Sequence, residues 1–337
     1  MKARAVIFPE ANRFEWTDLT LPEPGPGDVL VKTLVTAISP GTERWTLRGF
    51  HLGTKFPCVP GYHRIGIVEQ CGSDVTNLKV GDVVYGSSGR WEEENISCIF
   101  GAHVSHSVAA AGAYRLVDST IPDPATLENM AFTILAGVGN RGIRFCEVQA
   151  DEKVLIIGAG FVGICAAQLA ALRGAHPVLL EKNPERAEFV RGIVPDVVEC
   201  DDPELDAKLT ALAPGGFDLL YDTVGHAATT DAMVQKTRRQ GKLLLQAQYF
   251  DKEKCAIDLD QIKVKELTMK TTCGTDQKDF EDTLDNIREG RLKVAPTITH
   301  RFDAADALKG YELLHTGKPF NLGIVFHWDD RAKPSVS

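Results

Sequence analysis

The sequence predicts an α/β protein of two domains, an antiparallel β-barrel followed by a doubly wound parallel sheet. Its 337 residues are more than one hydrophobic core usually holds, because single cores stop growing at roughly 250–300 residues. Short β-like runs separated by proline and glycine fill the first third of the chain, whereas strand-like and helix-like segments alternate strictly from Lys153 onwards. Such alternation produces a parallel sheet, because each crossover helix covers one face of it.

The expected elements follow this division. In the β-rich part we expect strands at residues 3–8, 29–38, 65–68, 83–85 and 104–108. Helical periods begin at about Pro122, and the alternating part has expected strands at 154–157, 178–181, 197–200, 219–222 and 243–247, with helices at 161–173, 184–191, 204–212 and 228–237. After residue 267 we expect a strand, a helix at 280–289, a β segment at 297–301, a helix at 304–314 and a strand at 323–328.

These elements divide the chain into four segments. Residues 1–122 form the first part of the β domain, and residues 123–266 form the parallel-sheet domain. Residues 267–330 return to the edge of that sheet and then to the β domain. Residues 331–337 are expected to be a flexible polar tail.

The composition indicates a globular protein that binds a small molecule. With 44% hydrophobic and 25% charged residues, the chain can bury sizeable cores. A net charge of -9, without runs of lysine and arginine, argues against a nucleic-acid or membrane-surface partner, because those surfaces attract clustered cations. A small-molecule substrate is the remaining class of partner.

Cysteine usage and the absence of export signals favour the cytoplasm. The 8 cysteines are scattered and contain no CxxC pair, as expected for reduced thiols in a reducing compartment. The N-terminal sequence MKARAVIF lacks a signal-peptide hydrophobic stretch, and no run of about 20 apolar residues could span a bilayer. We therefore expect a cytoplasmic protein.

A glycine-rich turn follows the first strand of the alternating part. The sequence VLII leads into a G-x-G-x-x-G motif formed by Gly158, Gly160 and Gly163, which opens a helix. The first glycine permits the tight turn, the second lets the backbone approach a pyrophosphate, and the third lets the helix pack closely on the strand. Phosphates would be held by the free N–H groups at the start of this helix, which include those of Phe161 and Val162. The motif predicts a Rossmann dinucleotide-binding domain.

An acidic residue at the end of the next strand favours NAD as the cofactor. Glu181 stands where a carboxylate can accept hydrogen bonds from the adenosine ribose and would repel a 2′-phosphate. Lys182 and Arg186 lie close enough along the chain to keep NADP open, and Lys182 is included among the cofactor-binding candidates. The alternative is a glycine turn without a ligand and a glutamate that is merely a surface residue.

Motifs along nearly the whole chain resemble the medium-chain dehydrogenase/reductase superfamily, which contains zinc alcohol dehydrogenases and zinc-free quinone reductases. They are PGPGDVLVK at 24–32, PGYHRIGIV at 60–68, VGDVV at 80–84, the GAGFVG turn, YDTVG at 221–225 and GKLLL at 241–245. The resemblance implies a GroES-like barrel as catalytic domain, a central Rossmann domain and a C-terminal return to the catalytic domain. It also implies an active site in the cleft between the domains, with the nicotinamide near Val224 and Gly225.

The same resemblance implies a homo-oligomer. Members of the superfamily are commonly dimers or tetramers joined through their nucleotide-binding domains, and residues 267–273 are a plausible edge strand for such pairing.

The residues at the usual zinc-ligand positions do not fit a metal. Where zinc members carry a cysteine, this chain has Pro40, and where they carry Gly-His-Glu it has Gly61, Tyr62 and His63. The third ligand position falls near Leu135, and the four-cysteine lobe of zinc members is absent, with Cys98 as the lone cysteine of segment 87–99. Because tetrahedral zinc needs three or four N, S or O ligands, we predict a site without zinc.

Four residues are then candidates for the chemistry that zinc normally supports. Thr42 stands where superfamily members place a hydroxyl that relays the alcohol proton, so we assign it that role. Tyr62 and His63 stand at the edge of the site, where a histidine with a near-neutral pKa can act as general base or as a cation beside the oxyanion. Glu43 could orient either of them. The structural alternatives are that Thr42 and Glu43 cap a helix, that His63 is a bonded core histidine, and that Tyr62 is packing.

The leading interpretation is an NAD-dependent, zinc-free dehydrogenase that oxidises a secondary alcohol of a polyol, sugar or glycoside to a ketone, reversibly. The segments AISPGTE, EKNPER and THRFDAADALKGY resemble a zinc-free branch of the superfamily that includes bacteriochlorophyllide dehydrogenases and dehydrogenases of sugars or glycosides. The alternatives are an NADPH-dependent quinone or enone reductase, a bacteriochlorophyllide-type hydroxyethyl dehydrogenase and a non-catalytic nucleotide sensor. Candidates for shaping a substrate pocket are Trp45, His51, Trp91 and Tyr249.

Overall fold

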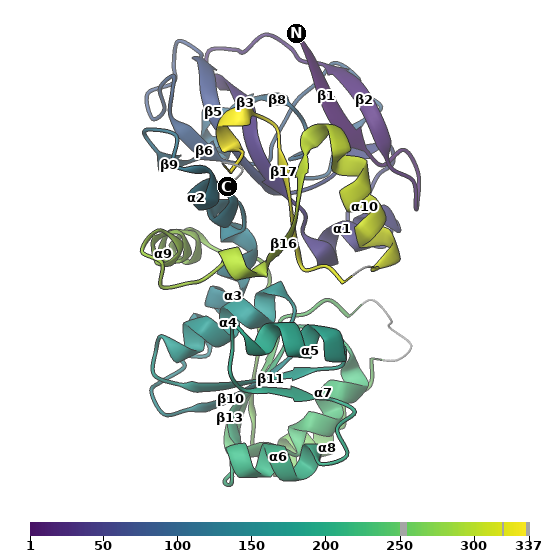
Figure 1. The fold of residues 1–337 in the computed structure, drawn as a ribbon, viewed down its shortest axis with the longest axis vertical. Helices are drawn as coiled ribbons and strands as arrows, with labels where there is room; N and C mark the ends of the chain where they lie inside the picture. The colour runs from purple at the N-terminus through teal and green to yellow at the C-terminus, as the bar shows by residue number, and fades with distance from the viewer. Residues whose placement is uncertain (250–254, 319, 335–337) are drawn as a thin grey trace. The chain divides into compact units, whose positions relative to one another are not determined.

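The computed structural model describes residues 1–249, 255–318 and 320–334. The chain forms two compact units: unit 1 comprises Met1–Phe132 and Thr297–Ser337, and unit 2 comprises Thr133–Pro296. Unit 1 is built on antiparallel strands and unit 2 on a parallel sheet covered by helices (Figure 1). The predicted α/β fold class is therefore confirmed.

Unit 1 is organised around the long strand β3. The main sheet has the order β16-β17-β3-β5-β6-β9, with β8 also pairing with β3, and two small sheets pair β1 with β2 and β4 with β7. The strands are β1 (Lys2–Ile7), β2 (Glu15–Thr20), β3 (Asp28–Ala37), β4 (Cys58–Val59), β5 (His63–Cys71), β6 (Val83–Tyr85), β7 (Ser97–Cys98), β8 (His106–Ala110), β9 (Arg115–Asp118), β16 (Ile298–Asp303) and β17 (Gly323–His327).

Three helices complete unit 1: α1 (Pro40–Leu47), α2 (Pro124–Ala131) and α10 (Ala307–Thr316). The sequence boundary at residue 122 assigned α2 to the parallel-sheet domain. In the structure α2 belongs to unit 1, because it packs on β3 and β5. The helical periodicity that begins there marks a helix covering the barrel rather than the start of the next domain.

The C-terminal part of the chain completes unit 1. Strand β17 pairs antiparallel with β3, with Val325 opposite Ala37, and it pairs parallel with β16. Helix α10 buries Tyr311 against Phe8 and Phe326, which places residues from both ends of the chain in one core. This arrangement brings α10 next to α1, the helix that carries two of the predicted site residues.

The prediction of a flexible tail at residues 331–337 is wrong for the first residues of that segment. Ala332 is completely buried in a short 3-10 turn, Asp330–Ala332, and Lys333 forms ion pairs with two aspartates. Asp329 pairs with Arg331 and Lys32, and these cations hold the pKa of its carboxyl well below its usual range. Ion pairing and one buried alanine thus anchor a segment that looks merely polar; residues 335–337 lie outside the described part.

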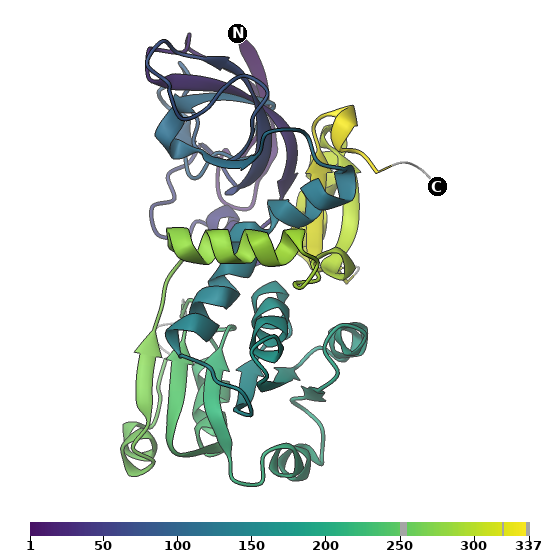
Figure 2. The ribbon, with the colours of Figure 1, turned by 90° about the vertical axis from the view of Figure 1, so that its left-hand side faces the viewer.

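Unit 2 is a parallel six-stranded sheet of order β12-β11-β10-β13-β14-β15, with helices on both faces (Figure 2). Its strands are β10 (Lys153–Ile157), β11 (His176–Glu181), β12 (Val197–Glu199), β13 (Phe217–Asp222), β14 (Thr237–Leu245) and β15 (Thr268–Thr271). Its helices are α3 (Thr133–Phe145), α4 (Phe161–Ala171), α5 (Pro184–Arg191), α6 (Leu205–Leu212), α7 (Ala227–Val234), α8 (Leu259–Val264) and α9 (Gln277–Arg288). The strand order reverses between β10 and β13, where doubly wound sheets bind their ligands.

The largest boundary error in unit 2 lies between the helix predicted at 228–237 and the strand predicted at 243–247, because β14 runs from Thr237 to Leu245. The helix expected at 228–237 ends at Val234, and Thr237 already begins β14 and pairs with Phe217. Threonine is β-branched, which favours a pleated strand over a helix.

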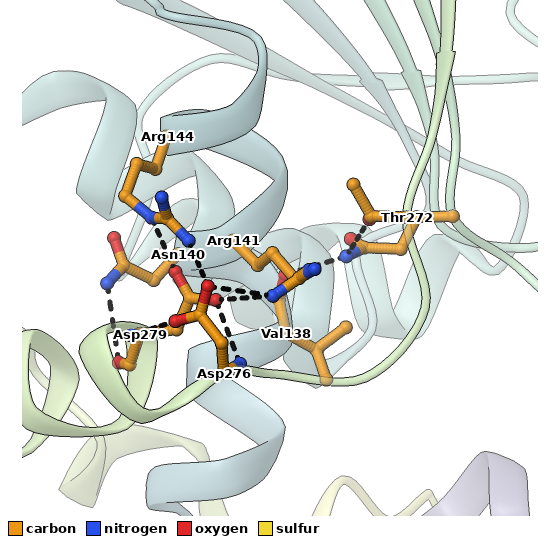
Figure 3. Close-up of polar contacts among 8 residues, drawn as sticks. Val138, Asn140, Arg141, Arg144, Thr272, Asp276 and Asp279 are labelled. Atoms are coloured by element: carbon orange, nitrogen blue, oxygen red, sulfur yellow. Dashed lines mark hydrogen bonds and ion pairs between the residues drawn. The ribbon is translucent and has the colours of Figure 1, made fainter.

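A buried ion-pair cluster joins α9 to α3 (Figure 3). Asp279 is fully buried and accepts hydrogen bonds from Arg144 Nε at 2.7 Å and Arg141 Nη1 at 3.1 Å. Asp276 caps α9 in a reciprocal capping box with Asp279, and it pairs with Arg144 Nη2 at 2.6 Å. The start of α9 is therefore fixed to α3 by charge as well as by packing.

We expect Asp279→Ala to lower the free energy of unfolding by about 2–3 kcal/mol, because it leaves two arginines without their buried partner. The figure is below that for a fully enclosed pair, because both arginines keep partial contact with water. Chemical denaturation followed by circular dichroism measures the effect. Glu281→Ala, on the exposed face of the same helix, is the matched control and should leave stability nearly unchanged. Equal losses in the two variants would contradict a stabilising role for the cluster.

Candidate active site

The glycine turn of unit 2 has the geometry that a bound pyrophosphate requires. Gly158 has a positive φ of 97°, and a Cβ on it would lie 2.4 Å from Val224 Cγ2. A Cβ on Gly163 would lie 2.0 Å from the carbonyl oxygen of Gly158, so helix α4 sits directly on the turn. By contrast, a Cβ on Gly160 would meet nothing within 4 Å among the described atoms. The turn is tight on two sides and open on the third, where a ligand could approach the backbone.

Helix α4 begins at Phe161, directly after this open glycine. Gly160 is its N-cap, and no side chain among the described residues caps it. The N–H groups at the start of a helix attract anions when protein groups do not occupy them. Phe161 and Val162 form the first turn of α4, and their binding of a phosphate stays a prediction.

Glu181 ends β11 beside the turn, and its carboxylate is already well bonded. Oε2 accepts a hydrogen bond from Ala159 N at 2.9 Å, and Oε1 accepts from the backbone N–H groups of Lys182 and Asn183. Arg186 Nη1 lies 3.7 Å from Oε2. Only the backbone of Lys182 meets the carboxylate, while its side chain is exposed. Glu181 thus braces the turn, and its bond to a ribose stays a prediction.

Val224 and Gly225 are held at the end of β13 by a buried aspartate. Asp222 Oδ1 accepts hydrogen bonds from Val224 N at 2.8 Å and Gly225 N at 3.0 Å. Its other oxygen accepts from Thr230 and from the hydroxyl of Tyr249. The side chain of Val224 is 54% exposed although it lies against Gly158. Tyr249, a candidate for the substrate pocket, therefore uses its hydroxyl to support this turn.

In unit 1, a pair of hydroxyl groups lies at the start of α1. Ser39 Oγ is 2.6 Å from Tyr62 OH. Burial raises the pKa of Tyr62 to about 12, although hydrogen bonds with Ser39 and Thr42 act in the opposite direction. The structure thus brings Thr42 and Tyr62 together as predicted candidates and adds Ser39 to them.

Glu43 does not orient Tyr62 or His63 directly, which corrects the role predicted for it. The residue is almost fully buried, and its Oε1 accepts a hydrogen bond from Ser39 N at 2.8 Å. Its Oε2 accepts from Tyr311 OH at 2.6 Å and lies 3.1 Å from His103 Nε2. Glu43 therefore stabilises the start of α1 by binding the backbone N–H of Ser39. This agrees in part with the alternative that Glu43 caps the helix.

His63 is a core residue, so it fits neither of its predicted roles, that of general base or that of a cation beside the oxyanion. It is completely buried, its Nδ1 lies 2.7 Å from Tyr85 OH, and its ring lies 4.2 Å from that of Tyr62. Burial lowers its pKa to about 3, so the imidazole is neutral at pH 7 and a very weak base. The sequence showed the histidine but not the apolar walls that suppress its charge.

Three residues of this site were missed by sequence reasoning: Ser39, His103 and Tyr311. A serine before Pro40 is a recognisable N-cap signal, and it could have drawn attention to Ser39. The pairing of His103 with a carboxylate 60 residues away has no local signal in the sequence.

The remaining candidates for the substrate pocket differ in whether they lie near the hydroxyl pair. Trp91 donates its indole N–H to the carbonyl of Ile96 and packs in a core cluster. The ring of His51 lies 5.8 Å from Phe100, and that of Phe100 lies 5.3 Å from Tyr62. Trp45 stacks edge to face with Phe50. Trp91 is thus structural, whereas His51 is linked to the hydroxyl pair through Phe100, another residue that sequence reasoning missed.

The donor set does not fit a zinc ion. Within residues 1–249, 255–318 and 320–334, no group of three or more histidine, cysteine, aspartate or glutamate side chains is placed to hold a metal. At the positions where the resemblance puts zinc ligands, the chain has Pro40, Tyr62 and Leu135, and the buried His63 stands one place beyond the usual histidine; proline and leucine offer no donor. In the described part of the chain, the structure also contains no helix long and apolar enough to cross a membrane.

Comparisons with known proteins identify both parts of the fold. The family model for the alcohol dehydrogenase GroES-like domain matches residues 25–120, and the model named zinc-binding dehydrogenase matches residues 162–289. Together they match about two thirds of the chain. The chain belongs to the medium-chain dehydrogenase/reductase superfamily. The resemblance deduced from its motifs is thereby confirmed.

Individual relatives match nearly the whole chain. It is 29% identical to 2-desacetyl-2-hydroxyethyl bacteriochlorophyllide A dehydrogenase of Rhodobacter capsulatus, over 98% of this chain and 99% of that protein. It is 28% identical to L-threonine 3-dehydrogenase of Ruegeria pomeroyi, over 97% and 100%. The crystal structure of an alcohol dehydrogenase from Escherichia coli CFT073 with NADH matches with a TM-score of 0.83 and 17% identity, over 97% and 99% of the two chains.

Proposed function

We propose that this chain is a zinc-independent, NAD-dependent dehydrogenase that oxidises a secondary alcohol of a polyol, sugar, glycoside or similar hydroxylated molecule to a ketone, reversibly. Relatives along nearly the whole chain that are named as dehydrogenases support an oxidoreductase acting on CH–OH groups. The observation that carries the rest is the Ser39–Tyr62 hydroxyl pair, which occupies the segments where the superfamily resemblance puts metal ligands.

The cofactor part of the proposal rests on unit 2. The glycine turn leaves an open approach at Gly160, and the bonded carboxylate of Glu181 places negative charge beside it. Negative charge at that point disfavours a 2′-phosphate and so favours NAD. Bound NAD would supply the hydride acceptor, and the residues that would hold it are those of the turn, Glu181, Lys182, Val224 and Gly225.

The chemical part rests on a tyrosine as proton carrier. In alcohol oxidation the hydroxyl proton must leave while the hydride departs from carbon with both electrons, so the substrate is oxidised and the cofactor reduced. As a phenolate, Tyr62 would take that proton on its oxygen and become a phenol, with Ser39 or Thr42 as its hydrogen-bond partner. With a pKa of about 12, nearly all of Tyr62 is protonated at pH 7, so the phenolate base is scarce there while the phenol is available to donate its proton to an alkoxide. The site therefore suits ketone reduction at neutral pH and alcohol oxidation at alkaline pH.

The test is reduced-nicotinamide absorbance in both directions with chelator-treated protein. One arm offers NAD with polyols, sugars, glycosides and simple secondary alcohols, and the other offers NADPH with quinones and enones. We expect NADH to form from one hydroxylated class and the matching ketone to be reduced by NADH. Activity confined to NADPH with quinones or enones would overturn the proposal and select a reductase, and cofactor binding without any turnover would select a nucleotide sensor.

A second candidate, a bacteriochlorophyllide-type hydroxyethyl dehydrogenase, is favoured by one observation. Phe100 holds its ring edge to face on Tyr62, is 38% exposed and has a positive φ of 72°. A bulky residue adopts this backbone conformation at a cost, and such strain gathers at functional sites. An exposed ring beside the hydroxyl pair suits a substrate with a flat ring next to its carbinol. Including a 1-arylethanol in the panel distinguishes the two candidates.

Two predictions of the sequence belong to the proposal unchanged, a cytoplasmic location and a homo-oligomer. Light scattering coupled to size-exclusion chromatography tests the second.

A further inference from the structure

A buried network in unit 1 ends on the hydroxyl pair. We propose that Tyr311 and His103 are positioning residues for this pair: they hold the Glu43 carboxylate on the backbone N–H of Ser39 and so leave the Ser39 hydroxyl free to bind Tyr62. The inference rests on the proposed function, because it assigns these residues to the machinery of that reaction.

Helix α1 is capped in an unusual way. A serine at the N-cap normally turns its hydroxyl onto a backbone N–H of the first helical turn. Ser39 is the N-cap of α1, yet its side chain makes no capping bond within the described residues, and its hydroxyl lies 2.6 Å from Tyr62 OH instead. Glu43 meanwhile binds the backbone N–H of Ser39 at 2.8 Å. The carboxylate anchors the residue, and its hydroxyl serves the site.

The buried carboxylate of Glu43 needs hydrogen-bond partners to be stable. Glu43 is 1% exposed, and burying a carboxylate is unfavourable unless hydrogen bonds compensate for the lost water. Tyr311 donates its hydroxyl to Oε2, and His103 Nε2 lies 3.1 Å from the same oxygen. Without these two partners the carboxylate would turn toward water, and Ser39 would lose its anchor.

His103 is held in place beneath the turn that carries Tyr62, just before β5. His103 Nδ1 lies 2.9 Å from Thr36 Oγ1, which also accepts the indole N–H of Trp328. Gly61 precedes Tyr62 with a positive φ of 86°, and a Cβ on it would lie 2.3 Å from the His103 ring. The glycine therefore lets the imidazole pass directly beneath the turn that presents Tyr62. Ser39 and the turn that carries Tyr62 are thus both held by the network of Glu43, His103 and Tyr311.

The test is a double-mutant cycle between Tyr311→Phe and Tyr62→Phe. Tyr311→Phe keeps the packed ring and removes only the hydroxyl that Glu43 accepts. We expect kcat for alcohol oxidation to fall about tenfold or more while KM for the alcohol and NADH binding stay within about twofold, because a misplaced catalytic group costs rate rather than affinity. In the Tyr62→Phe background the same change should have no further effect, because Tyr311 acts only through Tyr62.

A matched control separates positioning from mere loss of a buried hydroxyl. Tyr114 is also buried in unit 1, and its hydroxyl bonds to Ser107 and Arg64 without contacting the hydroxyl pair. Tyr114→Phe should leave kcat unchanged. An equal fall in kcat for Tyr114→Phe and Tyr311→Phe would overturn the proposal, as would a Tyr311→Phe effect that persists in full when Tyr62 is already phenylalanine.

A readout without turnover keeps this inference distinct from the proposed function. The alkaline absorbance titration of Tyr62, taken as the difference between the parent chain and Tyr62→Phe, should shift in Tyr311→Phe and in His103→Gln but not in Tyr114→Phe. If no alcohol is oxidised by the parent chain, the proposed function fails while this titration still decides the inference. An unshifted titration in both network variants would overturn it.

Discussion

Replacing Tyr62 with phenylalanine is expected to lower kcat for alcohol oxidation by about 100-fold or more, because it removes the group that we propose takes the substrate proton. The ring packing against His63 and Phe100 is kept, so the variant should fold normally and bind NADH as the parent does. Steady-state kinetics with the alcohol found in the panel, together with a cofactor titration, measures both properties. A variant with full turnover would remove Tyr62 from the mechanism.

The pH dependence gives this prediction a second signature. Since the pKa of Tyr62 is raised to about 12 by burial, the phenolate fraction increases about tenfold per pH unit throughout the range below 12. The rate of alcohol oxidation should therefore rise with that slope from about pH 7 to 10 without a plateau, while ketone reduction, which needs the protonated phenol, should stay flat. In Tyr62→Phe the slope should vanish. A plateau near pH 6–7 in the parent would instead indicate a histidine base.

Replacing Gly163 with alanine is expected to abolish measurable NADH binding, the second large effect. The new Cβ would lie 2.0 Å from the carbonyl oxygen of Gly158, a distance at which backbone must move. Helix α4 would be displaced from the turn, and its N–H groups would no longer converge on the pyrophosphate. Quenching of protein fluorescence on titration with NADH measures the loss.

The control for this prediction is a glycine of the same unit that has room for a side chain. A Cβ on Gly215 would meet no described atom within 4 Å, and the residue lacks a positive φ, so Gly215→Ala should bind NADH as the parent does. Circular dichroism of both variants shows whether unit 2 remains folded. Undiminished NADH binding in folded Gly163→Ala would contradict the assignment of the turn to the cofactor.

Local signals explain why the cofactor turn could be predicted from the sequence. The strand, the three glycines and the acid at the end of the following strand lie within a short stretch of chain, and each glycine has a steric reason that depends on nearby backbone. The structure places Gly158, Gly163 and Glu181 side by side as the pattern implies. The departures from the zinc pattern at Pro40 and Tyr62 could likewise be deduced from residue type alone.

The proposed catalytic residues of unit 1 could not all be predicted, because their contacts join segments far apart in the sequence. Tyr311 reaches Glu43 across 268 residues of sequence, and His103 reaches it across 60. Their pairing exists because β17 returns to β3 and brings α10 onto α1. The charge state of His63 could not be predicted either. Its pKa depends on burial by neighbours whose positions in space cannot be deduced from the sequence.

The start of the nucleotide-binding unit illustrates the same limit. Helical periodicity begins at about residue 122, yet α2 packs on the barrel strands and not on the parallel sheet. An amphipathic pattern shows that a helix has an apolar face but does not show which sheet covers it.

If the Ser39–Tyr62 hydroxyl pair takes the place of a metal ion, as we propose, turnover does not depend on zinc. The most direct measurement is the turnover of one alcohol before chelation, after exhaustive chelation, and after addition of one equivalent of zinc, with metal content determined at each step. We expect the same turnover at all three steps and no stoichiometric zinc in the active protein. Turnover that is lost with the metal and restored by one equivalent of zinc would contradict the proposal.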